Sequence, residues 1–191
     1  DYPTDLGKAK ALLDEAGYKV GNDGMRFSFT LDMPTYAKPQ MKISSEYLKA
    51  RLKEVGIDVQ LRRSPDFGTW VKRISSWEYD ATINGIWGYS DPVIGVHRLF
   101  VCENIRHVIW TNTEGYCNKD VDKMLAEAGA ATDDKKRVER YAQFQKTIKE
   151  ELPIYPMYES SYTTIHQTYV KNAPIRGWGA LTPWDEIYLD K

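Results

Sequence analysis

An alternation of short apolar strands and amphipathic helices between residues 27 and 87 most constrains what this chain can fold into. Apolar residues follow a period of two in three short segments and a helical period in the segments between them. Gly56 ends the first of these helices, and a Ser-Pro-Asp sequence caps the second. We expect strands from Phe27 to about Asp32, from Ile57 to Arg62 and from Tyr79 to Trp87, with helices from about Met41 to Val55 and after Ser64–Asp66.

This order predicts an α/β fold with a mainly parallel sheet and flanking helices. Adjacent parallel strands need a return path of helix length, and such crossovers are right-handed. Ligands of open parallel sheets bind beyond the carboxyl ends of the strands. Three loops should therefore share that edge, namely residues 33–40, 63–66 and 87–91.

The loop that follows the third strand has the composition of a small-molecule pocket. Glycines allow other atoms to approach the backbone closely, and aromatic rings beside a carboxylate offer both stacking and charge. We expect ligand contacts from this loop and from the loop after the first strand. The candidate ligand-binding residues are Tyr36, Lys38, Gly85, Trp87, Gly88, Tyr89, Ser90 and Asp91.

Some of these residues also have structural interpretations. Asp91 precedes Pro92, and Asp-Pro is a common turn that can cap a following helix. Lys38 can be a solvated surface residue. Trp87 and Tyr89 favour a binding role, because an exposed aromatic beyond the end of a strand is unusual without a partner.

Composition excludes some classes of protein. Lys and Arg number 26 against 27 Asp and Glu, so no net basic field attracts nucleic acid. No stretch approaches the roughly 20 apolar residues of a membrane span. The chain opens on Asp1-Tyr2-Pro3 without an apolar signal core, so we expect a mature chain or a fragment. Cys102 and Cys117 fit no zinc or redox motif, which leaves a disulfide and two free thiols equally open.

The flanking segments add mostly helices. Pro3-Thr4-Asp5 begins a short helix that ends at Gly17, and a short helix is possible from Val93 to Phe100. Further helices follow Asn118 and Thr132-Asp133-Asp134. The last of them has an apolar face that we expect in the core, formed by Val138, Tyr141, Phe144, Ile148 and Leu152. Two strands are expected in the tail, Leu152–Tyr158 and Thr163–Val170.

Catalysis is not indicated. Asp91, His97, His107 and His166 are residue types that carry acid-base chemistry, but no two histidines have metal-ligand spacing. The sequence also contains neither a Gly-x-Ser-x-Gly elbow nor a phosphate-binding glycine motif. We expect no enzyme activity and no cofactor.

Several phrases in order resemble the periplasmic substrate-binding proteins of peptide-type ABC importers, the dipeptide and oligopeptide receptors of family 5. The resemblance covers nearly the whole chain. The phrases that carry it are Asp5–Tyr18, Leu52–Val59, Trp77–Asp80, Ser90–Pro92, Gly115–Leu125, Thr132–Gln145 and Glu151–Tyr158.

The resemblance implies the carboxy-terminal part of such a receptor, with the lobe fold of a type II periplasmic binding protein. Residues 1–171 would form the second lobe, and residues 172–191 would cross back to a first lobe that is missing here. Relatives are exported to the periplasm, and some carry a disulfide at the places of Cys102 and Cys117, which favours that pairing.

The implied function is capture of a peptide or peptide-like solute between two lobes and delivery to the membrane subunits of an ABC permease. In peptide-binding relatives an aspartate in the loop after the third strand pairs with the ligand's amino terminus. The loop is shorter here, so Tyr89 or Ser90 falls near that place and Asp91 matches the following Asp-Pro step. One alternative is a receptor for an opine-like or sugar-derived solute. A hydrolytic enzyme is a second alternative, which the sequence supports least.

Overall fold

The computed structural model describes residues 3–159, 163–173 and 183–191. These residues form two compact units. The first contains the described residues up to Gly85 together with His107–Ile109, and the second contains Ile86–Arg106 and the described residues from Trp110 onward. Residues 174–182, which belong to the expected terminal segment, lie outside the described residues.

The first unit contains a parallel sheet, which confirms the predicted fold class. Strands β1 (Phe27–Met33), β2 (Ile57–Arg63) and β3 (Ala81–Thr82) lie in the order β2-β1-β3. Strands β1 and β2 pair along their whole length, while β3 pairs only with Leu31 and Asp32 of β1. The predicted third strand from Tyr79 to Trp87 is therefore too long. After Ile83, the Asn84 side chain accepts the Gly85 N–H at 2.8 Å, so the local side chain takes the place of a ladder partner.

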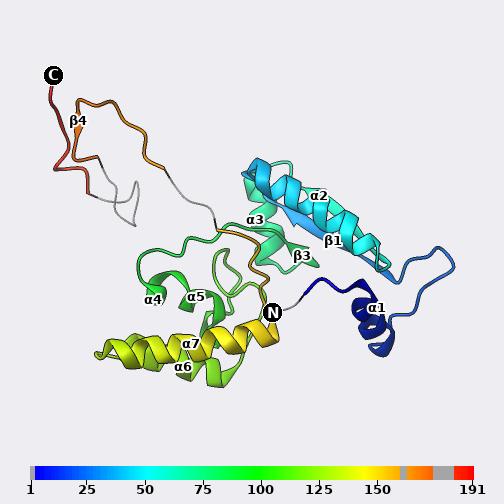
Figure 1. The fold of residues 1–191 in the computed structure, drawn as a ribbon. Helices are drawn as coiled ribbons and strands as arrows, with labels where there is room; N and C mark the ends of the chain where they lie inside the picture. The colour runs from blue at the N-terminus through cyan, green and yellow to red at the C-terminus, as the bar shows by residue number, and fades with distance from the viewer. Residues whose placement is uncertain (1–2, 160–162, 174–182) are drawn as a thin grey trace. The chain divides into compact units, whose positions relative to one another are not determined.

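The first unit also contains three helices (Figure 1). They are α1 (Leu6–Glu15), α2 (Pro39–Lys53) and α3 (Phe67–Ser75). The predicted caps are confirmed for α1 and α3, where Asp5 and Asp66 accept backbone N–H groups. Helix α2 runs along the sheet and begins at a proline, whose missing N–H costs nothing in the first turn. The buried interior includes Leu31, Val59, Trp70 and Ile74.

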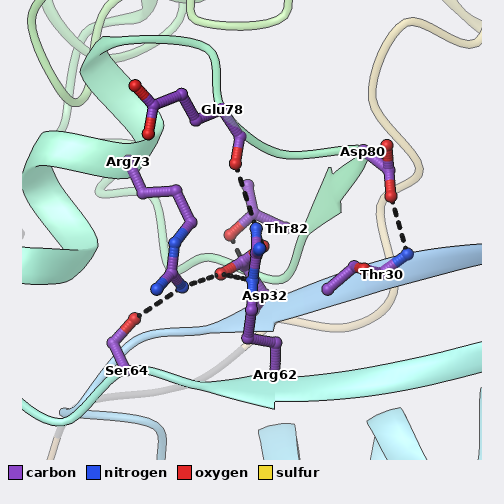
Figure 2. A network of polar contacts seen from close by, with 8 residues as sticks. All are labelled: Thr30, Asp32, Arg62, Ser64, Arg73, Glu78, Asp80 and Thr82. Carbon is purple, nitrogen blue, oxygen red and sulfur yellow. Dashed lines mark hydrogen bonds and ion pairs between the residues drawn. The ribbon is translucent and has the colours of Figure 1, made fainter.

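A buried carboxylate links three elements at the carboxyl end of β1 (Figure 2). Asp32 is fully buried and accepts two guanidinium groups, from Arg62 at the end of β2 and from Arg73 in α3. Arg62 binds both carboxylate oxygens, and its bond to Asp32 raises the pKa of Arg62 above its usual value. Arg73 also donates to the Ser64 hydroxyl at 3.2 Å. These contacts fix the loop after β2 relative to the ends of β1 and α3.

The second unit is helical between Pro92 and Glu151 and contains two short strands after that. Its elements are α4 (Pro92–Gly95), α5 (His97–Phe100), the 3-10 helix η1 (Cys102–Asn104), α6 (Lys119–Ala130), α7 (Asp134–Glu151), β4 (Val170–Lys171) and β5 (Tyr188–Leu189). Helices α6 and α7 lie side by side (Figure 1). Together with α5 they form a buried cluster of Leu99, Phe100, Val121, Leu125, Phe144 and Ile148.

The predicted caps of the second unit are also confirmed, at Asn118 for α6 and Asp133 for α7. Cys102 and Cys117 form the disulfide that the resemblance implied. Beside it, the buried Asn112 side chain donates to the carbonyls of Val101 and Tyr116 and accepts the Tyr116 N–H. The disulfide and Asn112 thus tie the residue 110–117 loop to the end of α5.

Four local predictions need correction. The expected Val93–Phe100 helix is divided into α4 and α5, and Val138 on α7 is 68% exposed. The expected strand Leu152–Tyr158 is absent from the described structure, because Leu152 turns into the left-handed region and two prolines lack N–H donors. In the described part of Thr163–Val170, only Val170 lies in a strand, where it pairs with Leu189.

Candidate functional site

In the first unit, Tyr36 connects the loops that follow β1 and β3. Its hydroxyl donates to the Asn84 Oδ1 at 2.5 Å, and the same oxygen accepts the Gly85 N–H. A methyl group on Gly85 would lie 3.2 Å from the Met41 terminal carbon, so the backbone there is closely packed. The structure therefore brings two predicted site residues, Tyr36 and Gly85, together at the carboxyl edge of the sheet.

Tyr36 also belongs to an aromatic cluster with Phe67 and Trp70. The Tyr36 ring meets the Trp70 ring edge-on at a centroid distance of 5.6 Å, and Phe67 lies 5.9 Å from Trp70. Trp70 is fully buried, whereas Tyr36 is 40% and Phe67 43% exposed. A buried ring thus supports two rings that face solvent. Sequence reasoning assigned Phe67 only to a helix face, although its place directly after the loop of β2 pointed to this edge.

A pocket of about 230 Å³ opens at the same edge of the sheet. It carries two cationic side chains, Lys42 from α2 and Arg63 from the end of β2. The other lining residues are Met33, Pro34, Thr35, Ala37, Ser64 and Pro65. Lys38 is the N-cap residue of α2 and does not line this pocket. Neither Lys42 nor Arg63 was a predicted site residue, because their approach depends on how α2 packs on β2.

In the second unit, residues Trp87–Asp91 form a loop that we call the aromatic loop. Trp87 is 47% exposed, and Tyr89 has a positive φ of 50°. The Arg98 guanidinium lies 5.4 Å from the centre of the Tyr89 ring and donates to the Trp87 carbonyl at 3.3 Å. Arg98 therefore ties the aromatic loop to α5.

Asp91 is engaged within the protein. Its carboxylate accepts the Val93 N–H at 2.8 Å as the cap of α4, and it pairs with the Arg137 guanidinium at 2.9 Å. Behind this pair, the His97 Nε2 lies 2.9 Å from the Tyr141 hydroxyl, and burial lowers the pKa of His97. These contacts account for the Asp91 carboxylate without a ligand.

The described residues offer no metal site and no helix long and apolar enough to cross a membrane. His107 bonds the Ser75 carbonyl and stacks on Trp77, while His166 bonds the Gln167 carbonyl. The candidate residues Tyr36, Lys38 and Gly85 belong to the first unit and Trp87–Asp91 to the second. Whether all of them face one ligand stays a prediction.

The architecture defines the class of protein. The solved structure of OppA from Burkholderia pseudomallei matches 97% of this chain with a TM-score of 0.76 at 22% identity, and 35% of its own length is matched. A dipeptide-binding protein of Pseudoalteromonas sp. SM9913, solved in complex with Met-Leu, matches 80% with a TM-score of 0.67 at 28% identity, over 29% of its length. The fold is that of a type II periplasmic binding protein.

The family follows from the sequence comparison. Residues 1–106 match the model of the family described as bacterial extracellular solute-binding proteins, family 5 Middle. A dipeptide-binding protein of Pseudomonas aeruginosa is 30% identical over 173 residues, or 90% of this chain. The chain belongs to the family 5 solute-binding proteins. It spans 31% of the length of that relative.

Proposed function

We propose that this chain is part of the extracytoplasmic solute-binding component of an ABC importer, and that the solute is a peptide or a peptide-like small molecule. The observation that carries the proposal is the aromatic cluster of Tyr36, Phe67 and Trp70 at the same sheet edge as the pocket lined by Lys42 and Arg63. Aromatic faces suit apolar side chains, and the two cations suit a carboxylate. Both groups occur together in a peptide.

The chain supplies one side of the site in this proposal. Tyr36 and Gly85 present one surface, with Lys38 near the start of α2, and Trp87, Gly88, Tyr89 and Ser90 present another. Asp91 serves mainly to shape the aromatic loop, because Arg137 and the Val93 N–H already bind its carboxylate. Chain beyond these residues would provide the opposing lobe, with residues 1–171 acting as the second lobe and 172–191 crossing back to the first.

The mechanism is binding without chemistry. The ligand enters between open lobes, the lobes close, and the closed form is recognised by the permease subunits in the membrane. A periplasmic location, the absence of a cofactor and the absence of nucleic-acid partners belong to the same proposal. The near balance of positive and negative residues agrees with a partner that is not a polyanion.

Calorimetry on the complete native protein tests the proposal. We expect Met-Leu or members of a tripeptide panel to bind, and Phe67→Ala to weaken binding by about tenfold or more, since a stacking face is lost. Tyr36→Ala should weaken binding similarly, whereas Tyr36→Phe keeps the ring. Ile43→Ala is the matched control, because Ile43 is 69% exposed and does not line the pocket. Preferential binding of opine-like or sugar-derived solutes over every peptide would contradict the peptide assignment.

A further inference from the structure

Two glycines from different segments of the second unit meet backbone to backbone. Gly88 lies in the aromatic loop, and Gly95 is the buried last residue of α4. A methyl group placed on Gly95 would lie 1.9 Å from the Gly88 carbonyl oxygen and 2.4 Å from its carbonyl carbon. Since the atoms in the way are backbone, no rotation of a side chain could relieve the clash. Only glycine at position 95 is compatible with this loop conformation.

The Arg98 side chain bridges α4 and the aromatic loop beside the contact between Gly88 and Gly95. Its Nε donates to the Gly95 carbonyl at 3.3 Å, and its Nη2 donates to the Trp87 carbonyl at 3.3 Å. The guanidinium lies over the Tyr89 ring. One planar group therefore contacts the helix on which the loop rests and both residues that flank Gly88. A planar fork with several donors can make these contacts at once, which an ammonium group cannot.

We propose that Gly95 and Arg98 are positioning residues that set the conformation of the aromatic loop, and thereby decide which ligands the receptor accepts. Gly95 permits the close approach of Gly88, and Arg98 orients Trp87 and Tyr89. Neither residue needs to touch the ligand. The claim about ligand choice rests on the proposed function, whereas the claim about loop conformation stands on the contacts within this unit.

The positioning role of Gly95 and Arg98 explains how the short aromatic loop keeps one conformation. Asp91 is fixed at one end by the Val93 N–H and Arg137, and Tyr89 adopts a positive φ, which is uncommon for a residue with a side chain. Such a conformation persists only where its surroundings hold it. Contacts from Gly95 and Arg98 supply that support next to the exposed Trp87 ring and the half-buried Tyr89 ring.

The first experiment needs no ligand. In the complete native protein, Gly95→Ala and Arg98→Met are each compared with wild type by hydrogen exchange of residues 86–92 and by the NMR shifts of the Tyr89 ring. We expect faster exchange in both variants and a shift of the Tyr89 ring protons in Arg98→Met, with partial return in Arg98→Lys. Unchanged exchange and unchanged Tyr89 shifts would overturn the positioning role.

Two controls isolate the effect. Gly129→Ala adds a methyl in the same region, where it would meet His97 and Val93 at an ordinary 3.4 Å. Arg140→Met removes an arginine from the same unit that pairs with Glu127. Both should leave the exchange of residues 86–92 and the Tyr89 shifts unchanged. If Gly95→Ala does not fold, Arg98→Met still decides the question.

The second experiment measures Met-Leu and tripeptide binding by calorimetry. We expect Arg98→Met to change the ratio of affinities among these peptides by about tenfold, because the rings that select side chains have moved. A displaced loop with unchanged ratios would refute the claim about ligand choice. If the wild type binds none of the peptides, that claim falls with the proposed function, while the exchange data still decide the loop conformation.

Discussion

Asp91 and Arg137, separated by 46 positions in the chain, form an ion pair with a distance of 2.9 Å between Oδ1 and Nη2. The pair joins the aromatic loop to helix α7 and so connects the start of the second unit to its long helix. Because the same carboxylate caps α4, one side chain serves two structural contacts.

This relationship predicts energetic coupling between the two residues. Their side chains are 46% and 26% exposed, so we expect a coupling energy of about 0.5–1 kcal/mol in a double-mutant cycle of Asp91→Asn and Arg137→Met. Urea unfolding of the four proteins measures it. A coupling near zero together with a large loss of peptide affinity in Asp91→Asn alone would instead indicate that Asp91 contacts the ligand.

The cluster around Asp32 predicts a much larger effect on stability. Asp32→Asn would leave the Arg62 and Arg73 guanidinium groups without their shared counter-charge at a fully buried position. We expect the free energy of unfolding to fall by about 3 kcal/mol, as when one partner of a buried pair is removed. Lys119→Met is the control, since its pair with Asp122 is exposed and should change stability by less than about 0.5 kcal/mol. Equal effects of the two changes would refute this interpretation.

The disulfide predicts a redox effect on stability. Cys102 and Cys117 are 15 positions apart, and a loop of that size stabilises the folded state by about 3 kcal/mol through the unfolded chain. Replacing both cysteines by serine should lower the urea midpoint of unfolding. Adding dithiothreitol to the wild type should lower this midpoint equally, because both changes remove the same cross-link. Dithiothreitol should leave the serine variant unchanged, and a response there would show that the reductant acts elsewhere.

Glu114 predicts an unusual pH dependence. Its Oε1 is buried without a hydrogen-bond partner among the described residues, and burial raises the pKa of Glu114 from 4.5 to about 7. Because the pKa of Glu114 is raised in the folded state, protonation of Glu114 favours the folded state. This contribution of Glu114 to the free energy of unfolding is complete below pH 4.5 and is lost as the pH rises towards 7.

Glu114→Gln isolates this contribution. Relative to the variant, wild type should lose up to about 3 kcal/mol of unfolding free energy between pH 4.5 and 7, measured by urea unfolding at intervals of pH. Parallel curves for the two proteins over this range would show that Glu114 has an ordinary pKa.

Local sequence signals predicted the helices well, because a helix start depends on a few adjacent residues. Asp5, Asp66, Asn118 and Asp133 were each expected at a helix start, and each accepts a backbone N–H there. The first two strands were similarly legible, since alternation reports which face of a strand is buried. Apolar character alone was less informative, as the exposed Val138 shows.

The candidate site was only partly legible in sequence. Tyr36 was predicted, but its partner Asn84 lies in the loop after β3 and its partner Phe67 begins α3. Lys42 and Arg63 line a pocket only because α2 packs on β2. Gly95 was likewise unremarked, because its importance depends on Gly88 lying against it. Such contacts have no sequence period and arise when separate segments meet.

The sequence by itself determined the order of strands and helices in the first unit, the parallel α/β class, four helix caps and the family. These features depend on neighbouring residues and on the order of short phrases. Tertiary structure decided where β3 ends and which side chains support the aromatic cluster. It also decided that Asp91 forms an ion pair with Arg137 and that Asp32 forms ion pairs with two arginines. The physical reason is that burial, charge pairing and close backbone approach depend on distances between segments far apart in the chain.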